Sequence, residues 1–237
     1  MGLLAYGEEA PHVAKIEPLP MSLPTIRDWS GKANLLVADG QEEVGGKKVT
    51  QVFTLRPDGS EIVNRTNPAT PGGPAADCHK GFAHFDPSGR YLVMTVESDE
   101  GGARPCGNPA SAPGMSAFTN LWLLDLRSGG WTNLTKYEGW RRGQLYGALS
   151  PYISHDGKKV LWSKLTGAPQ KRKPNKVFGE FELHVADLAF DPEPHLENDR
   201  FLFQGQMYEA HGFSPDDKRI LFASDQGLKY SGGSRYF

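Results

Sequence analysis

FDPSGRYLVM, the sequence of residues 85–94, recurs in related form twice further along the chain. Residues 153–162 read ISHDGKKVLW, and residues 213–222 read FSPDDKRILF. Each copy has an apolar residue, a tight polar turn, one or two basic residues and then an apolar run. Turns rich in Asp, Ser and Gly reverse the chain between two short strands. The three copies therefore predict an internal repeat of hairpins joined by loops of variable length.

The strands that follow these turns are apolar on both faces, so both sides of each sheet have to be covered. Four-stranded sheets packed radially achieve this, whereas a simple sandwich leaves one face of each sheet in water and shows cleaner alternation. No segment shows a sustained period of 3.6 residues, which argues against long helices. The sequence therefore predicts an all-β fold, a β-propeller of four-stranded blades. Its innermost strands are expected at residues 81–85, 148–153 and 209–213.

Composition and charge exclude several classes of protein. The 237 residues carry a net charge of −2, with 28 Gly and 18 Pro, which suits many turns between short strands. No apolar run approaches the roughly 20 residues of a membrane span, and residues 1–7 are too short and lack the basic start of a secretory signal. The basic loop at residues 171–176 has no interleaved aromatic residues, so we predict a solvated loop and no nucleic-acid partner.

The two cysteines, Cys78 and Cys106, fit no usual zinc or redox spacing. Both lie in Gly- and Pro-rich loops that flank the same predicted hairpin. One interpretation is a disulfide, which would add roughly 3 kcal/mol by the chain-entropy estimate and would indicate an oxidising compartment. The other is two free thiols in loops. The sequence leaves both open.

FSPDDKRILFAS at residues 213–224 resembles the repeat of TolB-type β-propellers, the PD40 or WD40-like repeat, whose turn is typically Ser-Pro-Asp-Gly. Residues 120–126, followed by Leu134 and Thr135, resemble the later part of that repeat. Asp217 replaces the turn glycine, and His155 replaces the proline of the turn. The resemblance covers residues 31–237, and residues 1–30 are an N-terminal extension or supply closing strands.

The number of blades is smaller than the resemblance implies. Three units and a partial fourth are visible, about four blades, whereas propellers of this family usually have six or more. Three alternatives stay open. The chain closes a small ring, it is an incomplete part of a larger propeller, or it needs a partner.

A propeller's innermost strands line its central channel, so polar residues on them are candidate ligand-binding residues. The predicted set is His79, His84, Tyr152, Glu209 and His211, together with Trp140 as an exposed platform. Imidazoles and a carboxylate that converge on one channel suit a polar ligand or a divalent metal such as Mn or Ca, with His84 and His211 as metal ligands. The alternative is that each side chain only bonds to a neighbouring blade.

Fold does not determine function. We predict a non-catalytic binding or scaffold module for a protein, saccharide or small ligand, periplasmic or secreted, with its binding surface where the inner strands begin. The resemblance implies two enzymatic alternatives. Oligogalacturonate lyases are similar propellers that act on uronate oligosaccharides and hold manganese through channel histidines. Prolyl-oligopeptidase-like peptidases use a propeller to gate a hydrolase domain, but its Gly-x-Ser-x-Gly nucleophile motif does not occur in this sequence.

Overall fold

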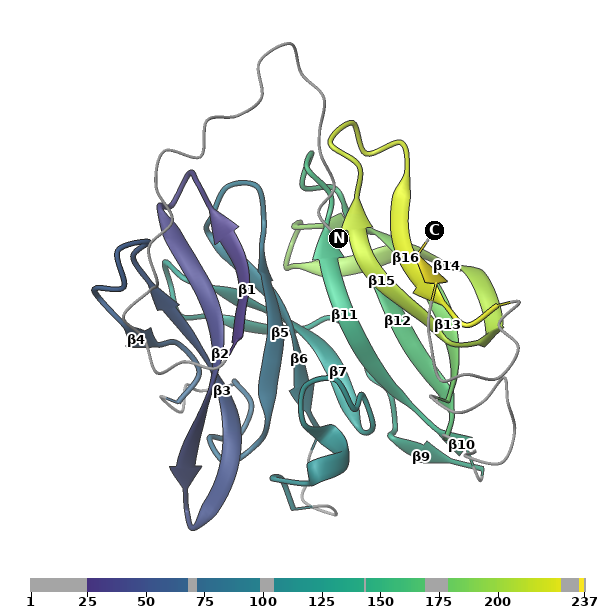
Figure 1. The fold of residues 1–237 in the computed structure, drawn as a ribbon, viewed down its shortest axis with the longest axis horizontal. Helices are drawn as coiled ribbons and strands as arrows, with labels where there is room; N and C mark the ends of the chain where they lie inside the picture. The colour runs from purple at the N-terminus through teal and green to yellow at the C-terminus, as the bar shows by residue number, and fades with distance from the viewer. Residues whose placement is uncertain are drawn as a thin grey trace.

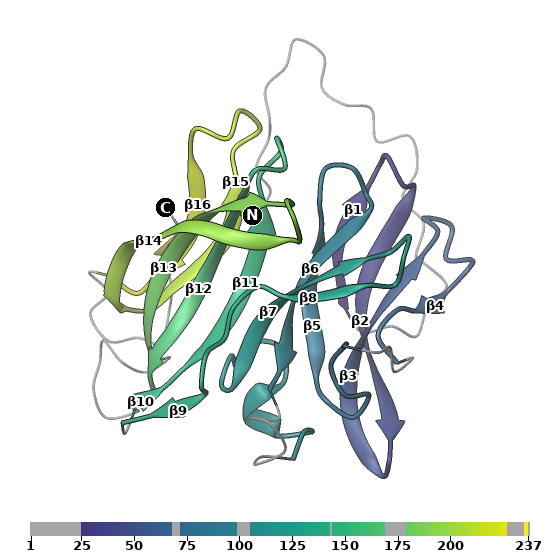
Figure 2. The same cartoon turned by 180° about the vertical axis from the view of Figure 1, so that it is seen from behind.

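The computed structural model describes residues 25–67, 72–98, 105–142, 144–168, 179–226 and 235–236. The basic loop at 171–176 and most of the predicted extension at 1–30 lie outside these residues. Within them the chain forms antiparallel sheets that follow one another side by side in chain order, like a fan (Figures 1 and 2). The structure is therefore an all-β propeller arrangement, as the hairpin repeat predicts.

The sheets are named blades 1 to 4. Blade 1 contains β1 (Thr25–Ser30), β2 (Leu35–Val44), β3 (Lys47–Leu55) and β4 (Val63–Asn64). Blade 2 contains β5 (Lys80–Phe85), β6 (Tyr91–Glu97), β7 (Thr119–Asp125) and β8 (Trp131–Asn133). Blade 3 contains β11 (Gly147–Ile153), β12 (Lys159–Gly167), β13 (Glu180–Ala189) and β14 (His195–Gln206). Blade 4 contains β15 (Tyr208–Phe213), β16 (Ile220–Ser224) and β17 (Arg235–Tyr236).

Two smaller elements lie in the connections between strands. A two-stranded hairpin, β9 (Trp140–Arg141) and β10 (Gln144–Leu145), precedes blade 3, and the 3-10 turn η2 (Pro109–Ser111) lies between β6 and β7. The first strand, β1, comes from the stretch that the sequence left as an extension or as closing strands. In the structure it is the first strand of blade 1.

Apolar side chains fill the space between successive blades. Val37 of blade 1 packs in one cluster with Phe85 and Leu92 of blade 2. The next two interfaces are built in the same way, around Val93 of blade 2 and Leu161 of blade 3. The middle strands are thus buried on both faces, which is why their sequences show no alternation.

Each inner strand holds one more residue than the strand paired with it, at the same place in every blade. The pairing register shifts between Ile26 and Asp28 in β1, and the other three inner strands have equivalent shifts. Such β-bulges bend a strand and redirect its side chains. The first residues after the bulges therefore occupy equivalent positions, one per blade: Asp28, His84, Tyr152 and Gly212.

The turns that follow the inner strands stack on each other from blade to blade. A Cβ on Gly89 would lie 2.6 Å from Ser30 Oγ of the preceding turn, so a glycine is needed there. Asp217, in the equivalent position of blade 4, has a positive φ of 56°. Its carboxylate accepts the backbone N–H groups of His155 and Asp156, each at 2.9 Å. The residue that departs from the repeat therefore links the turns of blades 3 and 4.

The Asp217→Ala variant is expected to lower the free energy of unfolding by about 1–2 kcal/mol, because two hydrogen bonds are lost and alanine disfavours a positive φ. Asp217→Gly loses the same bonds but tolerates the backbone, so its loss should be smaller. Urea denaturation of both variants measures the difference. An alanine variant at least as stable as the glycine variant would contradict this account.

Candidate functional site

A cavity of ≈ 450 Å³ lies where the four inner strands end and their turns begin. These are the upper ends of β11 and β15 in Figure 1. All four blades contribute to its wall. The wall includes Asp28, Lys32, His84, Tyr152, His155 and His211. The cavity therefore combines acidic, basic and aromatic side chains from segments that are far apart in the sequence.

Three of the equivalent positions after the bulges form a continuous row of contacts across the blades. His84 Nδ1 lies 3.6 Å from Asp28 Oδ2, and the rings of His84 and Tyr152 have their centroids 4.1 Å apart. At Gly212, with φ +119°, a Cβ would lie 3.6 Å from the Tyr152 ring. One residue from each of the first three blades thus contacts the next, and Tyr152 lines the cavity.

Burial and neighbouring groups shift the pKa values of two residues in this row, Asp28 and Tyr152. Burial raises the pKa of Asp28, but the His84 imidazole and the N–H groups of Phe85 and Trp29 outweigh it, so the net pKa is lowered. Burial raises the pKa of Tyr152 to about 12, with the negative charges of Glu209 and Asp28 adding to the effect. At neutral pH the row therefore presents a carboxylate and a neutral phenol.

Arg27, the extra residue in the bulge of β1, also lines the cavity. Its Nε donates to Asp39 Oδ2 at 2.6 Å, and its guanidinium lies 4.0 Å from the centroid of the Phe82 ring. Burial raises the pKa of Asp39, and the charge of Arg27 opposes this shift. Neither Arg27 nor Asp28 is among the residues predicted from the sequence, although IRDWSGK at residues 26–32 already has the strand-and-turn pattern of an inner hairpin.

The predicted ligand-binding residues separate into three groups. His84, Tyr152 and His211 line the cavity. Glu209 lies beside it: one carboxylate oxygen is 3.9 Å from His211 Nε2, and the other accepts the Ser150 hydroxyl at 3.2 Å. His79 and Trp140 are not among its lining residues.

His79 and Trp140 lie away from the cavity, and the structure gives a physical reason for each. His79 is buried, and its Nδ1 accepts the backbone N–H of Thr50 at 3.0 Å. Trp140 is 57% exposed, on the β9–β10 hairpin at the opposite end of the sheets (Figure 1). The cavity is thus at the ends of the inner strands, whereas the sequence predicts a binding surface where they begin. The bulges and the stacked turns create the hollow at the ends.

A metal site would need several ligand atoms close together. In the part of the chain that the structure describes, one group of at least three His, Cys, Asp or Glu side chains has its ligand atoms within 4.8 Å, namely Asp77, Cys78 and Cys106. Its two cysteines are joined to each other. His84 and His211 belong to no such group among these residues.

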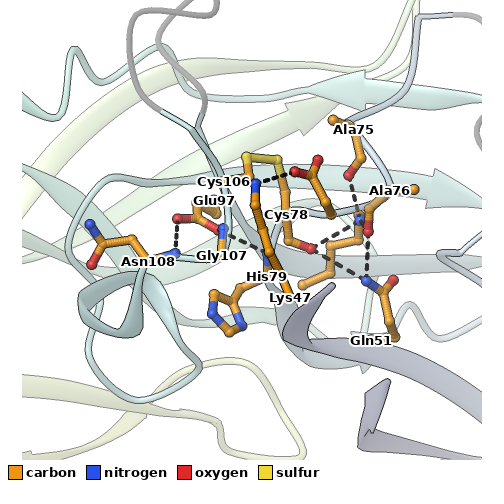
Figure 3. Close-up of polar contacts among 12 residues, drawn as sticks. Lys47, Gln51, Ala75, Ala76, Cys78, His79, Glu97, Cys106, Gly107 and Asn108 are labelled. Carbon is orange, nitrogen blue, oxygen red and sulfur yellow. Dashed lines mark hydrogen bonds and ion pairs between the residues drawn. A yellow bond between two sulfur atoms is a disulfide. The ribbon is translucent and has the colours of Figure 1, made fainter. Parts of the chain in front are cut away.

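At the end of blade 2 that lies away from the cavity, a disulfide and several hydrogen bonds join the connecting loops (Figure 3). Cys78 and Cys106 form a disulfide, with their Cα atoms 4.5 Å apart, which is one of the two alternatives that the sequence left open. The buried Glu97 carboxylate accepts three backbone N–H groups, from His79 at 3.0 Å, Gly107 at 2.7 Å and Asn108 at 2.9 Å. These contacts tie the long insertion after β6 to the loop before β5.

Lys80, the first residue of β5, also binds the loop that precedes this strand. Its side chain is fully buried, and Nζ donates to the carbonyl groups of Ala75 at 2.7 Å, Ala76 at 3.1 Å and Cys78 at 3.1 Å. Burial lowers the pKa of Lys80 to about 8. The lysine therefore organises the loop before β5, and it is part of the structural support for the blade.

Comparison with known proteins supports the fold. No family model matches the sequence, and no curated protein matches it. The solved structure of a putative TolB from Agrobacterium tumefaciens matches with a TM-score of 0.55 and 16% identity, over 92% of this chain and 61% of that chain. TolB from Acinetobacter baumannii matches with a TM-score of 0.54 and 15% identity, over 90% of this chain and 39% of that chain.

An oligogalacturonate lyase in complex with manganese matches less well, with a TM-score of 0.46 and 15% identity, over 83% of this chain and 43% of that chain. The chain thus spans less than two thirds of the length of each of these proteins. Identities this low show a common fold and do not transfer an activity. The chain has the β-propeller fold of the TolB structures.

Proposed function

We propose that this chain is a non-catalytic binding module that holds a carboxylate-bearing ligand, either an acidic segment of a protein or an acidic saccharide, in the cavity at the ends of the inner strands. The observation that carries this proposal is the row of Asp28, His84 and Tyr152, which places one polar side chain from each of three blades on the wall of one cavity. Rigid strands hold these groups in place, as a pre-formed binding site requires.

The hydrogen-bond donors around the cavity suit an anionic ligand. The acidic groups on its wall are already bonded to the backbone. Asp28 accepts the N–H groups of Trp29 at 2.7 Å and Phe85 at 2.9 Å, and Asp86 accepts those of Ser88 and Tyr91. The ammonium group of Lys32 and three imidazoles also line the cavity. A hydrogen bond from the charged Lys32 ammonium group to a carboxylate is a strong one, and imidazole N–H groups also donate to carboxylates, so these side chains suit that ligand.

A titration with two probes tests the proposal and separates the sources of the carboxylate. One probe is an oligogalacturonate and the other a glutamate-rich peptide, each with an uncharged counterpart as control. We expect one of the acidic probes to bind, with about tenfold weaker affinity in Lys32→Glu, a change of about 1.4 kcal/mol. Lys48→Glu, on the exposed part of β3, makes the same charge change away from the cavity and should bind like the original protein.

Three outcomes of that titration would overturn the proposal. They are binding that is equally tight for the uncharged counterparts, binding that Lys32→Glu leaves unchanged, and a failure of both acidic probes to bind. The salt dependence gives an independent measurement, because a charged contact at an open cavity weakens as ionic strength rises.

The enzymatic alternatives make different predictions. A metal-dependent lyase that acts on uronate oligosaccharides would need a divalent ion held by His84 and His211, and both line the same cavity. Incubation of the oligogalacturonate with protein and Mn²⁺ would then generate an unsaturated product that absorbs in the ultraviolet, and Mn²⁺ would raise Tm. The gating propeller of a prolyl-oligopeptidase-like peptidase would act on a hydrolase domain, whose Gly-x-Ser-x-Gly motif does not occur in these 237 residues.

The disulfide supports a periplasmic or secreted location, because disulfides persist in oxidising compartments. None of the described segments is a helix of the length and apolar character needed to cross a membrane. We propose a protein or polysaccharide partner, and no nucleic acid. The basic loop that would bear on nucleic acid, residues 171–176, lies outside the described residues.

A further inference from the structure

Arg27 carries a positive charge that is more buried than that of Lys32, although both side chains line the cavity. The Arg27 side chain is 20% exposed, whereas Lys32 lies in the turn after β1 and is exposed. Salt screens an exposed charge strongly and a partly buried charge much less. A contact between a ligand and Arg27 therefore keeps more of its strength in salt than a contact with Lys32.

Two neighbours fix the plane of the Arg27 guanidinium. Nε donates to Asp39 Oδ2 at 2.6 Å, and the guanidinium carbon lies 4.0 Å from the centroid of the Phe82 ring. Asp39 belongs to β2 of blade 1, and Phe82 lies in the bulge of β5 in blade 2, so both neighbours are on sheet strands. A guanidinium held in this way loses little conformational freedom when it binds a ligand.

The ion pair with Asp39 uses only one edge of the guanidinium. In the part of the chain that the structure describes, neither Nη1 nor Nη2 of Arg27 is bonded to an acceptor. Arg90 shows the other arrangement, because its Nε and Nη2 donate to the two carboxylate oxygens of Asp125 at 3.0 and 2.6 Å. Asp39 thus orients Arg27 and leaves its two terminal NH2 groups for another acceptor.

We propose that Arg27 binds the carboxylate of the ligand through these two NH2 groups, and that this contact makes the cavity prefer an acid to its uncharged counterpart. The proposal rests on the proposed function and assigns its main binding residue. Two parallel N–H groups of a guanidinium match the two oxygens of a carboxylate, which a lysine ammonium group does not. Asp39 and Phe82 are then positioning residues.

The position of Tyr152 supports this assignment. Burial raises the pKa of Tyr152 to about 12, and the nearby charge of Arg27 opposes this rise. Both side chains line the cavity. The charged fork of Arg27 and the neutral phenol of Tyr152, which is also a hydrogen-bond donor, therefore act on the same part of the cavity.

Calorimetric titration of the full chain with the oligogalacturonate and with the glutamate-rich peptide tests the role of Arg27. We expect Arg27→Gln to bind the acidic ligand at least about tenfold more weakly, because hydrogen bonds to a charged group are lost. Any binding of the uncharged counterparts should not change, whereas general damage to the cavity would weaken both. Arg27→Lys should restore only part of the affinity, since it keeps the charge without the fork.

Salt separates the contribution of Arg27 from that of Lys32. In about 0.5 M NaCl, the difference between the original protein and Lys32→Glu should shrink, whereas the difference from Arg27→Gln should persist. Arg90→Gln is the matched control, because it makes the same change at an arginine that is paired with an aspartate outside the cavity. It should bind like the original protein.

A second variant guards against loss of the fold. Arg27→Gln leaves the buried Asp39 carboxylate without its ion pair, which destabilises a protein. The Arg27→Gln, Asp39→Asn double variant removes both charges, and it should fold, as circular dichroism can check, with the same loss of affinity as Arg27→Gln.

The outcomes distinguish this inference from the proposed function. Tight binding of an acidic probe by the folded double variant would overturn the role of Arg27 and leave a cavity that binds carboxylates. Full affinity in Arg27→Lys, or an equal loss in Arg90→Gln, would overturn it as well. If neither acidic probe binds the original protein, the proposed function fails, and the role of Arg27 fails with it.

Discussion

Replacement of Gly147 by alanine is expected to lower the free energy of unfolding by about 3 kcal/mol, the upper part of the usual range for overpacking. Gly147 begins β11, the inner strand of blade 3. A Cβ at this residue would overlap the backbone carbonyl oxygen of Ser116, at the end of the insertion between β6 and β7. A carbonyl group of the backbone cannot rotate away as a flexible side chain can.

Hydrogen bonds around Ser116 keep its backbone from moving away from β11. Thr119 Oγ1 lies 2.9 Å from Ser116 O and accepts the backbone N–H of Ala148 at 2.9 Å. The N–H of Phe118 donates to Tyr146 O at 3.0 Å. Relief of the overlap would therefore break contacts that join blade 2 to blade 3, so the strain has to be absorbed across the interface.

Urea denaturation measures this effect, and Gly31→Ala is the matched control. A Cβ on Gly31 meets no atom within 4 Å, so this variant should lie within about 0.5 kcal/mol of the original protein. The account fails if Gly147→Ala is as stable as Gly31→Ala, because the close approach of the Ser116 carbonyl would then be unimportant.

Loss of the Cys78–Cys106 disulfide is expected to lower the free energy of unfolding by about 3–4 kcal/mol. The two cysteines are 28 residues apart in sequence, and the chain-entropy estimate for a loop of this length gives that magnitude. The bond limits the conformations of the unfolded chain, and in the folded state it joins two segments that Glu97 also holds. The Cys78→Ser, Cys106→Ser double variant should therefore fold, but less stably.

Denaturation with and without a reductant provides the measurement. The original protein should lose stability when reduced, whereas the double serine variant should be unaffected by the reductant, which controls for other effects of the reagent. The disulfide lies at the start of β5 and the cavity lies at its end, so ligand binding should survive in the double variant at temperatures where it is folded. Equal stability of the oxidised and reduced protein would contradict the prediction.

The hairpin repeat made the fold predictable, because its signals depend on residues that are close together in the sequence. A polar turn after one apolar segment and before another specifies a hairpin locally. Apolar residues on both faces of the second strand then indicate that neighbouring sheets cover both sides. His84, Tyr152 and His211 could be placed on the channel for the same reason, since each lies on an inner strand directly before a recognisable turn.

The location of the cavity depended on contacts between distant segments. Nothing near His79 in the sequence shows that Thr50 would bind its ring, and nothing near Trp140 shows that its hairpin would lie away from the cavity. Asp28 was missed because the GKAN turn after β1 contains no Asp, whereas each of the other three turns does. Alternation along a strand identifies which residues share a face. The end at which four strands leave a hollow is set by β-bulges and stacked turns, which arise only when the blades pack together.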